Sequence, residues 1–218
     1  QVGYSANDIL SNKKFTDIYV EVMYVAGFKP SAETLLNLID FIASRTNKTN
    51  IVIEERLINI SLKSVYSIDD IRSIEDANRS IFSNENQLAI SALFLDGKSS
   101  NDTETNTILG TSYRNTSFVI FEETIQNSSN NILGPDKIVL ESSVILHEFG
   151  HLLGLVNKGT SMVVNHEDTT NNAHCTNENC LMYYLIEHGK NPHHWVQDGQ
   201  IPQLDTNCIN DLRANGGK

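Results

Sequence analysis

The stretch HEFGHLLGL, from His147 to Leu155, decides how the rest of the chain is interpreted. Its first five residues match the HExxH signature, and in a helix His147 and His151 lie one turn apart on the same face. Two neutral imidazoles at this spacing can bind one tetrahedral Zn2+, and Glu148 is placed to polarise a water molecule at the metal. The motif therefore predicts the zinc site of a peptidase.

The flanking residues predict the helix that carries the motif. Gly134-Pro135-Asp136 is typical of a helix start, with a proline and an acidic residue near the positive end of the dipole. Gly154 is expected to end the helix, because glycine adopts the left-handed conformation without steric cost. Apolar residues recur at helical spacing on the face turned away from the histidines: Ile138, Ile145, Phe149 and Leu152. The alternative is an amphipathic helix whose paired histidines bind no metal.

Length and composition indicate one globular enzyme-sized unit. With 218 residues and 39% apolar residues, we expect a single metallopeptidase domain over 1–218. A cleft is expected to separate a sheet-and-helix subdomain at 1–154 from a loop-rich subdomain at 155–218. The net charge of -11, spread along the chain, argues against nucleic acid or an anionic membrane as a partner.

The N-terminal residue and the polar composition of the chain bear on where in or outside the cell the protein works. No stretch is long and apolar enough to span a bilayer, and Gln1 is not an initiator. We therefore expect a removed signal or a lipid anchor upstream of Gln1. The richness in Asn, Ser and Thr and the low lysine content favour an extracytoplasmic location, whether secreted, periplasmic or lipid-anchored. We also expect a monomer.

The first half of the chain alternates strand and helix patterns. Strands are predicted at 18–25, 50–60 and 88–95, and helices at 31–45 and 68–82. The order strand, helix, strand places the first two strands parallel in one sheet. The fold class expected is α+β, with a twisted mixed sheet, two covering helices, the motif helix and an irregular C-terminal part that ends in a short helix at 203–213.

The segment before the motif helix predicts a pair of strands beside the cleft. Residues 108–113 and 117–124 flank a short turn, and the second run alternates in a way that suits a sheet edge with one covered face. Residues 127–131 then form a polar loop. An exposed edge next to a metal can bind an extended peptide as an added strand, and an edge that binds nothing is the equal alternative.

A catalytic zinc normally has three protein ligands, so a third must be found. Asn157 stands six residues after His151, but its neutral amide is a poor ligand and fits a turn with Lys158-Gly159. The remaining candidates lie downstream, and they are His166, His174, His188, His193 and His194.

The segment HCTNENCLMYY, from His174 to Tyr184, favours one of these candidates as the third ligand. Together with HEFGHLLG it resembles the archaemetzincin branch of the metzincin metallopeptidases, in which a ligand histidine is followed by Cys-x4-Cys-x-Met. The resemblance implies a zincin-like fold, His174 as the third ligand and Met182 as the methionine of the turn beneath the zinc. Residues 157–173 would then form an inserted surface loop, which adds little loop-closure entropy.

Several roles are possible for His166, which lies in this inserted loop. It can act beside a ligand, bind a separate ion with Glu167 and Asp168, or be a plain polar loop residue. Asp168 is also a candidate to orient a histidine.

The sequence departs from the family at its second, structural zinc site. The family places a later CxxC at positions that here are Gln200 and Gln203. Cys208, even with His193 or His194, makes a second zinc doubtful, and a disulfide between Cys175 and Cys180 is expected instead. The composition also resembles, more weakly, secreted or lipid-anchored zinc proteases of Bacteroidetes-type bacteria.

The chemistry that these residues imply is metal-assisted peptide hydrolysis. Glu148 serves as the general base, and Tyr184 is a candidate to contact the zinc or the oxyanion. The alternative from another class is a zinc-containing module that binds peptides or glycans without hydrolysis. The intact Glu148 argues against such a binder, because binding does not need a base.

Overall fold

A five-stranded sheet forms the centre of the protein, in the order β2-β1-β4-β7-β6. The computed structural model describes residues 1–60, 63–130, 134–188 and 199–218. Only the edge strand β6 runs antiparallel to its neighbour, and the other pairs are parallel. The strands are β1 (Asp17–Tyr24), β2 (Asn50–Leu57), β4 (Gln87–Leu95), β6 (Gly110–Arg114) and β7 (Ser117–Phe121).

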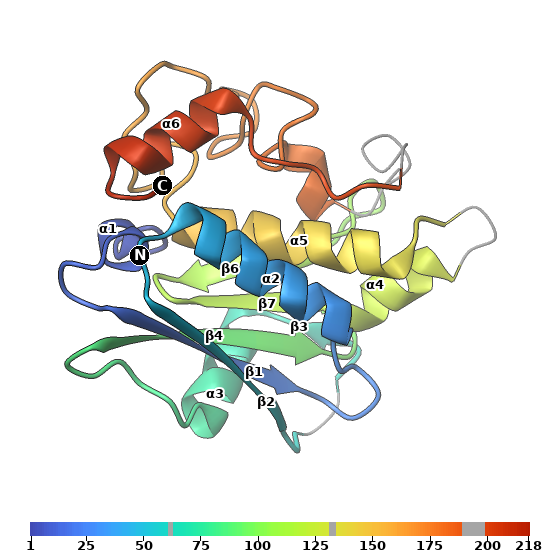
Figure 1. Cartoon of the computed structure of the whole chain (residues 1–218). Helices are drawn as coiled ribbons and strands as arrows, with labels where there is room; N and C mark the ends of the chain where they lie inside the picture. Colours follow the sequence, from blue (N-terminus) through green and yellow to red (C-terminus); the bar gives the residue numbers. More distant parts are fainter. Residues whose placement is uncertain (61–62, 131–133, 189–198) are drawn as a thin grey trace.

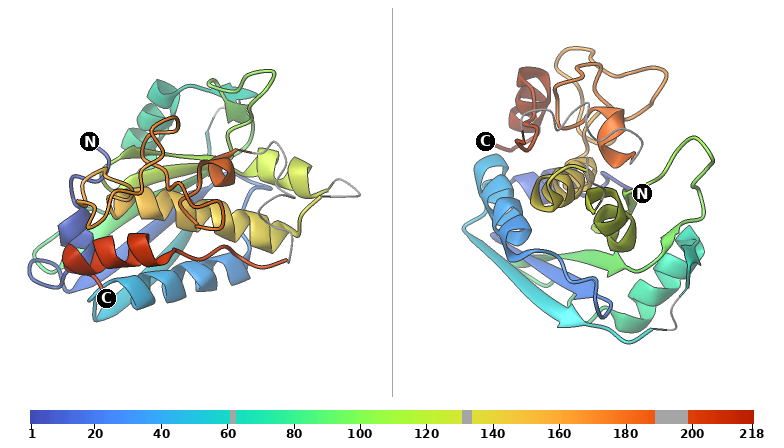
Figure 2. Two further views of the ribbon diagram at one scale, coloured as in Figure 1. Left: turned by 90° about the horizontal axis from the view of Figure 1, so that it is seen from above. Right: turned by 90° about the vertical axis from the view of Figure 1, so that its right-hand side faces the viewer.

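Helices cover both faces of this sheet. Helices α2 (Ala32–Arg45) and α5 (Lys137–Leu152) lie on one face, and α3 (Ile68–Asn78) lies on the other (Figures 1 and 2). Strand β1 shows why both faces need a covering layer, because its apolar side chains alternate between the two faces of the sheet. Val20 belongs to the core under α2 and α5, whereas Met23 packs in the second core with Ile71 of α3.

The C-terminal segments lie on the side of α5 that faces away from the sheet. They include the short 3-10 helix η1 (Tyr184–Glu187) and α6 (Thr206–Ala214), which Figure 1 shows above α5. Helix α5 is therefore covered on both sides, and its residues from Leu140 to Leu152 are all buried. The remaining elements are α1 (Ala6–Leu10), α4 (Glu122–Ser129) and a two-stranded sheet of β3 (Val65–Tyr66) and β5 (Lys98–Ser99).

The predicted mixed sheet with covering helices is confirmed, with shifted boundaries. The predicted strand 50–60 ends at Leu57, and the predicted helix 68–82 ends at Asn78. The prediction for 117–124 was wrong in two respects. Strand β7 lies inside the sheet with all five residues buried, and the chain then enters α4 directly, where a strand end and a polar loop were expected. Two-sided burial explains the error, since both faces of an internal strand are apolar.

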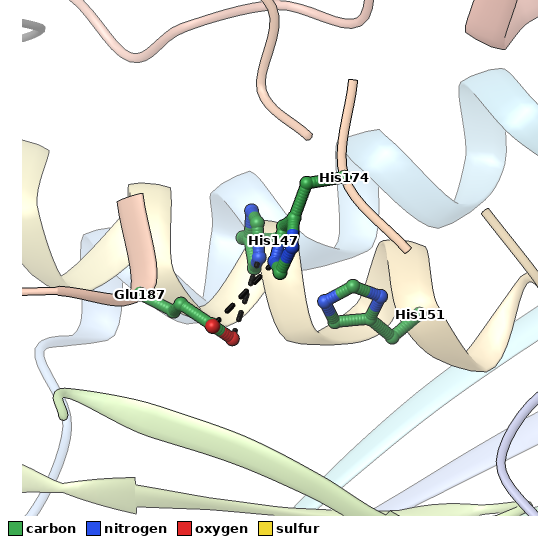
Figure 3. A group of neighbouring side chains, drawn as sticks. All are labelled: His147, His151, His174 and Glu187. Atoms are coloured by element: carbon green, nitrogen blue, oxygen red, sulfur yellow. Dashed lines mark ion pairs between the residues drawn. The ribbon is translucent and has the colours of Figure 1, made fainter. Parts of the chain in front are cut away.

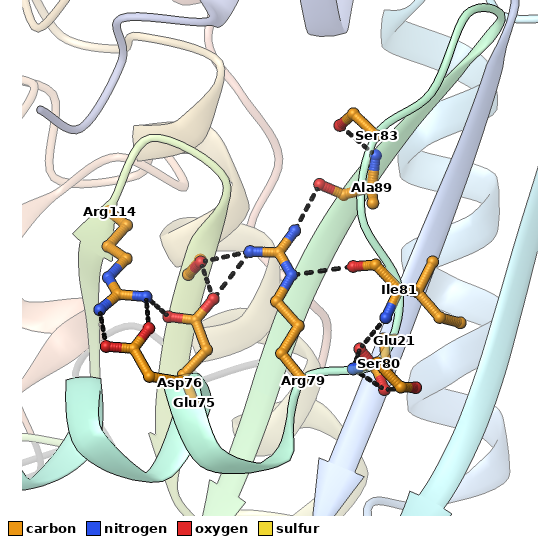
Figure 4. A network of polar contacts seen from close by, with 10 residues as sticks. Glu21, Glu75, Asp76, Arg79, Ser80, Ile81, Ser83, Ala89 and Arg114 are labelled. Carbon is orange, nitrogen blue, oxygen red and sulfur yellow. Dashed lines mark hydrogen bonds and ion pairs between the residues drawn. The ribbon is translucent and has the colours of Figure 1, made fainter.

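A network of charged side chains joins α3 to the sheet (Figure 4). The buried carboxylate of Glu75 forms ion pairs with Arg79, at 2.8 Å, and Arg114, at 3.0 Å. It also accepts a hydrogen bond of 2.6 Å from Ser117 of β7. Burying a carboxylate is costly unless it is paired in this way. The network thus fixes the position of α3 under the strands that lead to the edge strand β6.

Within the described residues, no helix combines the length and the apolar character needed to cross a membrane.

Candidate metal centre

Helix α5 places His147, Glu148 and His151 in the interior between the sheet and the C-terminal segments. The helix begins after Asp136, whose carboxylate accepts a hydrogen bond of 3.1 Å from the Val139 backbone N–H. It ends at Leu152, and Gly154 has a φ of +80°. A side chain at position 154 would also meet the backbone of Thr160, so only glycine fits this sharp exit.

His174 reaches the same place because its segment is held by backbone hydrogen bonds. The Asp168 N–H donates to the His174 carbonyl at 2.8 Å, and the Thr176 N–H donates to the His166 carbonyl at 3.0 Å. The Cys175 N–H donates to the Met182 carbonyl at 2.8 Å. Residues 157–173 therefore partly support His174, and Thr160 and His166 within them are buried.

The three histidine rings meet around one point (Figure 3). The ring centroids of His147 and His151 lie 4.8 Å apart, and each lies 5.2 Å from that of His174. Their ligand atoms and a carboxylate oxygen of Glu187 all lie within 4.8 Å of one another. Two of these rings come from α5 and the third comes from a loop 23 residues after His151, so the spacing alone does not bring them together.

The hydrogen bonds of the histidines suit a metal. The Nδ1 atoms of His147, His151 and His174 face the backbone carbonyls of Leu181, Leu155 and Asn171, at 2.7, 3.0 and 3.3 Å. A carbonyl only accepts, so each Nδ1 carries the proton and each Nε2 offers a lone pair in the neutral ring. Among the described residues, Nε2 of His147 and of His174 is buried and has no hydrogen-bond partner. This donor set fits a Zn2+ ion.

Burial shifts the pKa values of the α5 groups. It lowers the pKa of His147 to about 4, with a contribution from His174, and it lowers the pKa of His151 well below the usual value. Both rings are therefore neutral, as metal ligands must be. Burial, and next the carboxylate of Glu187, raise the pKa of Glu148 to about 8.

Glu148 is fixed by the edge strand of the sheet. The Ser112 hydroxyl in β6 lies 2.8 Å from both the carbonyl oxygen and Oε2 of Glu148. The strand can approach this closely because Gly110 has no side chain, and a Cβ there would lie 3.0 Å from Glu148 Cγ. The other oxygen, Oε1, is buried without a hydrogen-bond partner among the described residues. Glu148 thus has one oxygen held by the protein and one available to a reactant.

Glu187, which the sequence did not mark as a candidate, joins the three histidines. It is the last residue of η1, and its Oε2 lies 3.8 Å from His147 Nε2 while its Oε1 lies 3.5 Å from His174 Nε2. The sequence motif does not include Glu187. The residue reaches the histidines because the chain turns after Met182 and enters η1.

Other residues named from the sequence lie elsewhere. Asn157 is exposed and donates to Glu167 at 3.0 Å, outside the histidine cluster. Tyr184 packs against Tyr183, with ring centroids 4.8 Å apart, and its ring centroid lies 6.0 Å from that of His188. Within the described ranges it has no hydrogen bond to the three histidines. His193 and His194 lie outside the described residues.

His166 has a role that the sequence analysis did not foresee. Its Nε2 lies 2.8 Å from Asp211 Oδ2, and its Nδ1 lies 3.3 Å from the sulfur of Cys175. His166 is a loop residue, as one alternative had it, but it is buried and makes specific contacts. Among the described residues its neighbours in a possible ion site are Cys175, Asp205 and Cys208, where Glu167 and Asp168 were considered. Asp168 instead accepts from the Thr170 N–H and from Asn171, and within the part of the chain that the structure describes it has no hydrogen bond to a histidine side chain.

The expected disulfide between Cys175 and Cys180 is absent, because all three cysteines are free and buried. Cys180 faces Cys208 of α6, with the two sulfurs 3.6 Å apart. The backbone N–H groups of Met182 and Asp205 both donate to Cys180 Sγ at 3.4 Å. Hydrogen bonds with Cys175 and Cys208 lower the pKa of Cys180 to about 4.

These cysteines belong to a second cluster of ligand atoms. His166, Cys175, Asp205 and Cys208 place their ligand atoms within 4.8 Å of one another, and Cys180 adjoins them. Tetrahedral Zn–S bonds give sulfur–sulfur distances of about 3.8 Å, close to the separation of the Cys180 and Cys208 sulfurs. The sequence signal that could have marked this cluster is Asp205-x-x-Cys208, which lies five residues beyond Gln200 and Gln203, the positions at which the family's cysteines were expected.

Comparisons with known proteins place the fold. No protein-family model matches the chain, and no curated protein matches its sequence. The crystal structure of archaemetzincin from Methanopyrus kandleri matches with a TM-score of 0.58 and 14% identity, over 92% of this chain and 96% of that chain. The structure of a zinc-dependent peptidase from Methanocorpusculum labreanum matches with a TM-score of 0.54 and 13% identity, over 88% and 99%.

Both matches extend over nearly the whole chain, while the identities are low. The likeness therefore concerns the arrangement of sheet, helices and C-terminal segments. The chain has the zincin-like mixed α/β fold of archaemetzincin.

Proposed function

We propose that this protein is a zinc-dependent endopeptidase. The observation that carries the proposal is the convergence of three imidazoles whose Nδ1 atoms are held by backbone carbonyls, beside the buried carboxylate of Glu148. His147, His151 and His174 would hold one zinc ion. Zinc, when bound, supplies Lewis acidity that polarises a peptide carbonyl and acidifies water.

Glu148 is the general base in this proposal. In the ionised form of Glu148, Oε1 has no hydrogen-bond partner among the described residues, so it can accept a proton from the attacking water and return it to the leaving amine. Ser112 holds the other side of the carboxylate, so the base keeps one orientation during both transfers. Tyr184 as an oxyanion contact stays a prediction, since its observed contacts are with Tyr183 and His188.

The substrate class that fits is a protein or peptide in extended conformation. Strand β6 lies at the edge of the sheet and carries Ser112 next to Glu148. An extended peptide can pair with such an edge through main-chain hydrogen bonds, which positions one of its carbonyls by the base. This supports peptide hydrolysis over the alternative of a non-catalytic peptide- or glycan-binding module, in which a buried Glu148 has no use.

A second, structural metal is also part of the proposal. Cys175, Cys180 and Cys208, together with Asp205 or His166, offer enough ligands to close a tetrahedral site. Such an ion would tie α6 to the segment that carries His174 and Met182. It would also protect three buried thiols in the extracytoplasmic location that the composition favours. That location, the upstream lipid anchor and a monomeric state stay predictions.

The experiment that tests the catalytic site compares three variants with the wild type. His174→Ala should lower the zinc content of the purified protein by about one ion per chain, whereas Asn157→Ala should leave it unchanged. Glu148→Ala should keep zinc and fold but lose hydrolysis of a denatured protein substrate. Equal zinc loss in the two variants at positions 174 and 157 would overturn the ligand assignment, and retained turnover in Glu148→Ala would overturn the general-base role.

A further inference from the structure

Glu187 stands where a fourth ligand of the catalytic metal would be. Its two carboxylate oxygens lie 3.8 Å from His147 Nε2 and 3.5 Å from His174 Nε2 (Figure 3). In a tetrahedral zinc site with bonds of 2.0–2.1 Å, neighbouring ligand atoms are about 3.3–3.4 Å apart. The carboxylate is thus spaced from these two nitrogens nearly as one ligand is from another.

The hydrogen-bond pattern suits a cation at this contact. His147 and His174 carry their protons on Nδ1, where backbone carbonyls accept them, so each neutral ring turns the Nε2 lone pair toward Glu187. Lone pairs of a carboxylate and of two imidazoles repel one another in a buried place. A positive ion between them converts this repulsion into coordination.

The backbone of Glu187 is held in place independently of its side chain. The Leu109 N–H, just before the edge strand β6, donates to the Glu187 carbonyl at 2.8 Å. The next residue, His188, forms an antiparallel bridge with Ile108. The carboxylate is therefore positioned near the histidines by residues 187–188, whose backbone pairs with residues 108–109 just before β6.

We infer that Glu187 is a fourth, displaceable protein ligand that closes the catalytic metal site at rest. The inference rests on the proposed zinc site and describes how that site is regulated. A permanently closed set of four protein ligands is typical of structural zinc and would leave Glu148 without a function. The side chain of Glu187 is 20% exposed, whereas that of His147 is fully buried, so Glu187 is the ligand that can leave.

The structure also offers a place for the displaced carboxylate. His188 Nε2 lies 3.5 Å from Glu187 Oε1, and its Nδ1 is buried without a hydrogen-bond partner among the described residues. An incoming peptide carbonyl and water would compete with Glu187 for the metal, and the freed carboxylate would turn to His188. The free-energy barrier to hydrolysis would then include the free energy needed to displace Glu187.

The test uses the full chain with Co2+ in place of zinc, because Co2+ has a visible absorption spectrum that reports its ligands. Azide is the probe for an open coordination position, and it is titrated into the wild type, Glu187→Ala and Glu187→Gln. Glu178→Gln is the matched control, since Glu178 is an exposed carboxylate in the preceding turn. We expect Glu187→Ala to bind azide at least tenfold more tightly than wild type and control, with Glu187→Gln between them.

Equal azide affinity in wild type and Glu187→Ala would overturn the inference. With zinc, Glu187→Ala should also raise kcat/KM for a peptide, because substrate no longer displaces a carboxylate. A fall in kcat/KM to the level of Glu148→Ala would equally overturn it. Failure of the proposed function looks different, since the wild type would then bind no Co2+ or zinc at the histidines, or would hydrolyse no peptide in any variant.

Discussion

The sulfur of Met182 occupies the space that a side chain at Gly150 would need. A Cβ placed on Gly150 would overlap with Met182 Sδ, and its other nearest neighbours would be carbons of the same methionine. Gly150 lies between Glu148 and His151 in α5, and Met182 follows Leu181, whose carbonyl accepts from His147 Nδ1. The glycine inside the HEFGH stretch is therefore the point where the turn at Met182 packs against α5, next to the histidine cluster.

Gly150→Ala should destabilise the protein by about 1–3 kcal/mol, because an extra methyl group overpacks the contact with Met182. Chemical denaturation monitored by circular dichroism measures this loss. Ser143→Ala, at another buried position of α5, is the control and should change stability much less. Adding Met182→Ala to Gly150→Ala should cost less than the sum of the single changes, since the smaller residue removes the overlap. Strict additivity would show that the two residues do not compete for this space.

Ser112→Ala should lower kcat about tenfold, since one hydrogen bond is worth about 0.5–1.5 kcal/mol and here it orients the general base. Zinc content and the thermal midpoint should stay near those of the wild type. Steady-state kinetics with a peptide substrate and metal analysis of the same preparations provide the measurement. Thr111→Ala, on the neighbouring position of β6, is the control. An unchanged kcat in Ser112→Ala would mean that Glu148 keeps its orientation without the hydroxyl.

Cys208→Ser should remove about one metal ion per chain while the histidine site keeps its own. Metal analysis by mass spectrometry on the intact protein under native conditions measures the stoichiometry. The thermal midpoint should fall by several degrees, because α6 loses its link to the segment of Cys175 and Cys180. Thr206→Ala, exposed in the same helix, should change neither quantity. A wild type that carries a single ion would refute the second site.

Glu75→Ala should destabilise the fold by about 3–5 kcal/mol, because it leaves Arg79 and Arg114 without their buried partner. The neighbouring Asp76 provides a matched comparison, since its side chain is 65% exposed and it also pairs with Arg114. Asp76→Ala should cost less than about 1 kcal/mol. Urea denaturation of both variants measures the difference. Equal losses of stability in the two variants would indicate that the buried ion pairs of Glu75 stabilise the fold no more than the exposed pair of Asp76 does.

The sequence alone determined the parts of the fold that depend on local patterns. The apolar periods predicted the strands β1, β2 and β4 and the helices α2 and α5, because such periods follow from which side of an element is buried. The order strand, helix, strand predicted that β1 and β2 are parallel. The HExxH spacing placed two imidazoles and one carboxylate on one turn of α5, since helical geometry fixes those positions without help from the rest of the chain.

The tertiary structure decided which distant groups join them. Strand β7 was misplaced at an edge because burial on both faces erases the alternation that marks an edge. Nothing in the spacing shows that Glu187 reaches His147, or that Cys208 faces Cys180 where a Cys175–Cys180 disulfide was expected. These contacts arise where loops fold back over α5, and loop paths follow from packing and backbone hydrogen bonds between segments far apart in sequence, which no local period records.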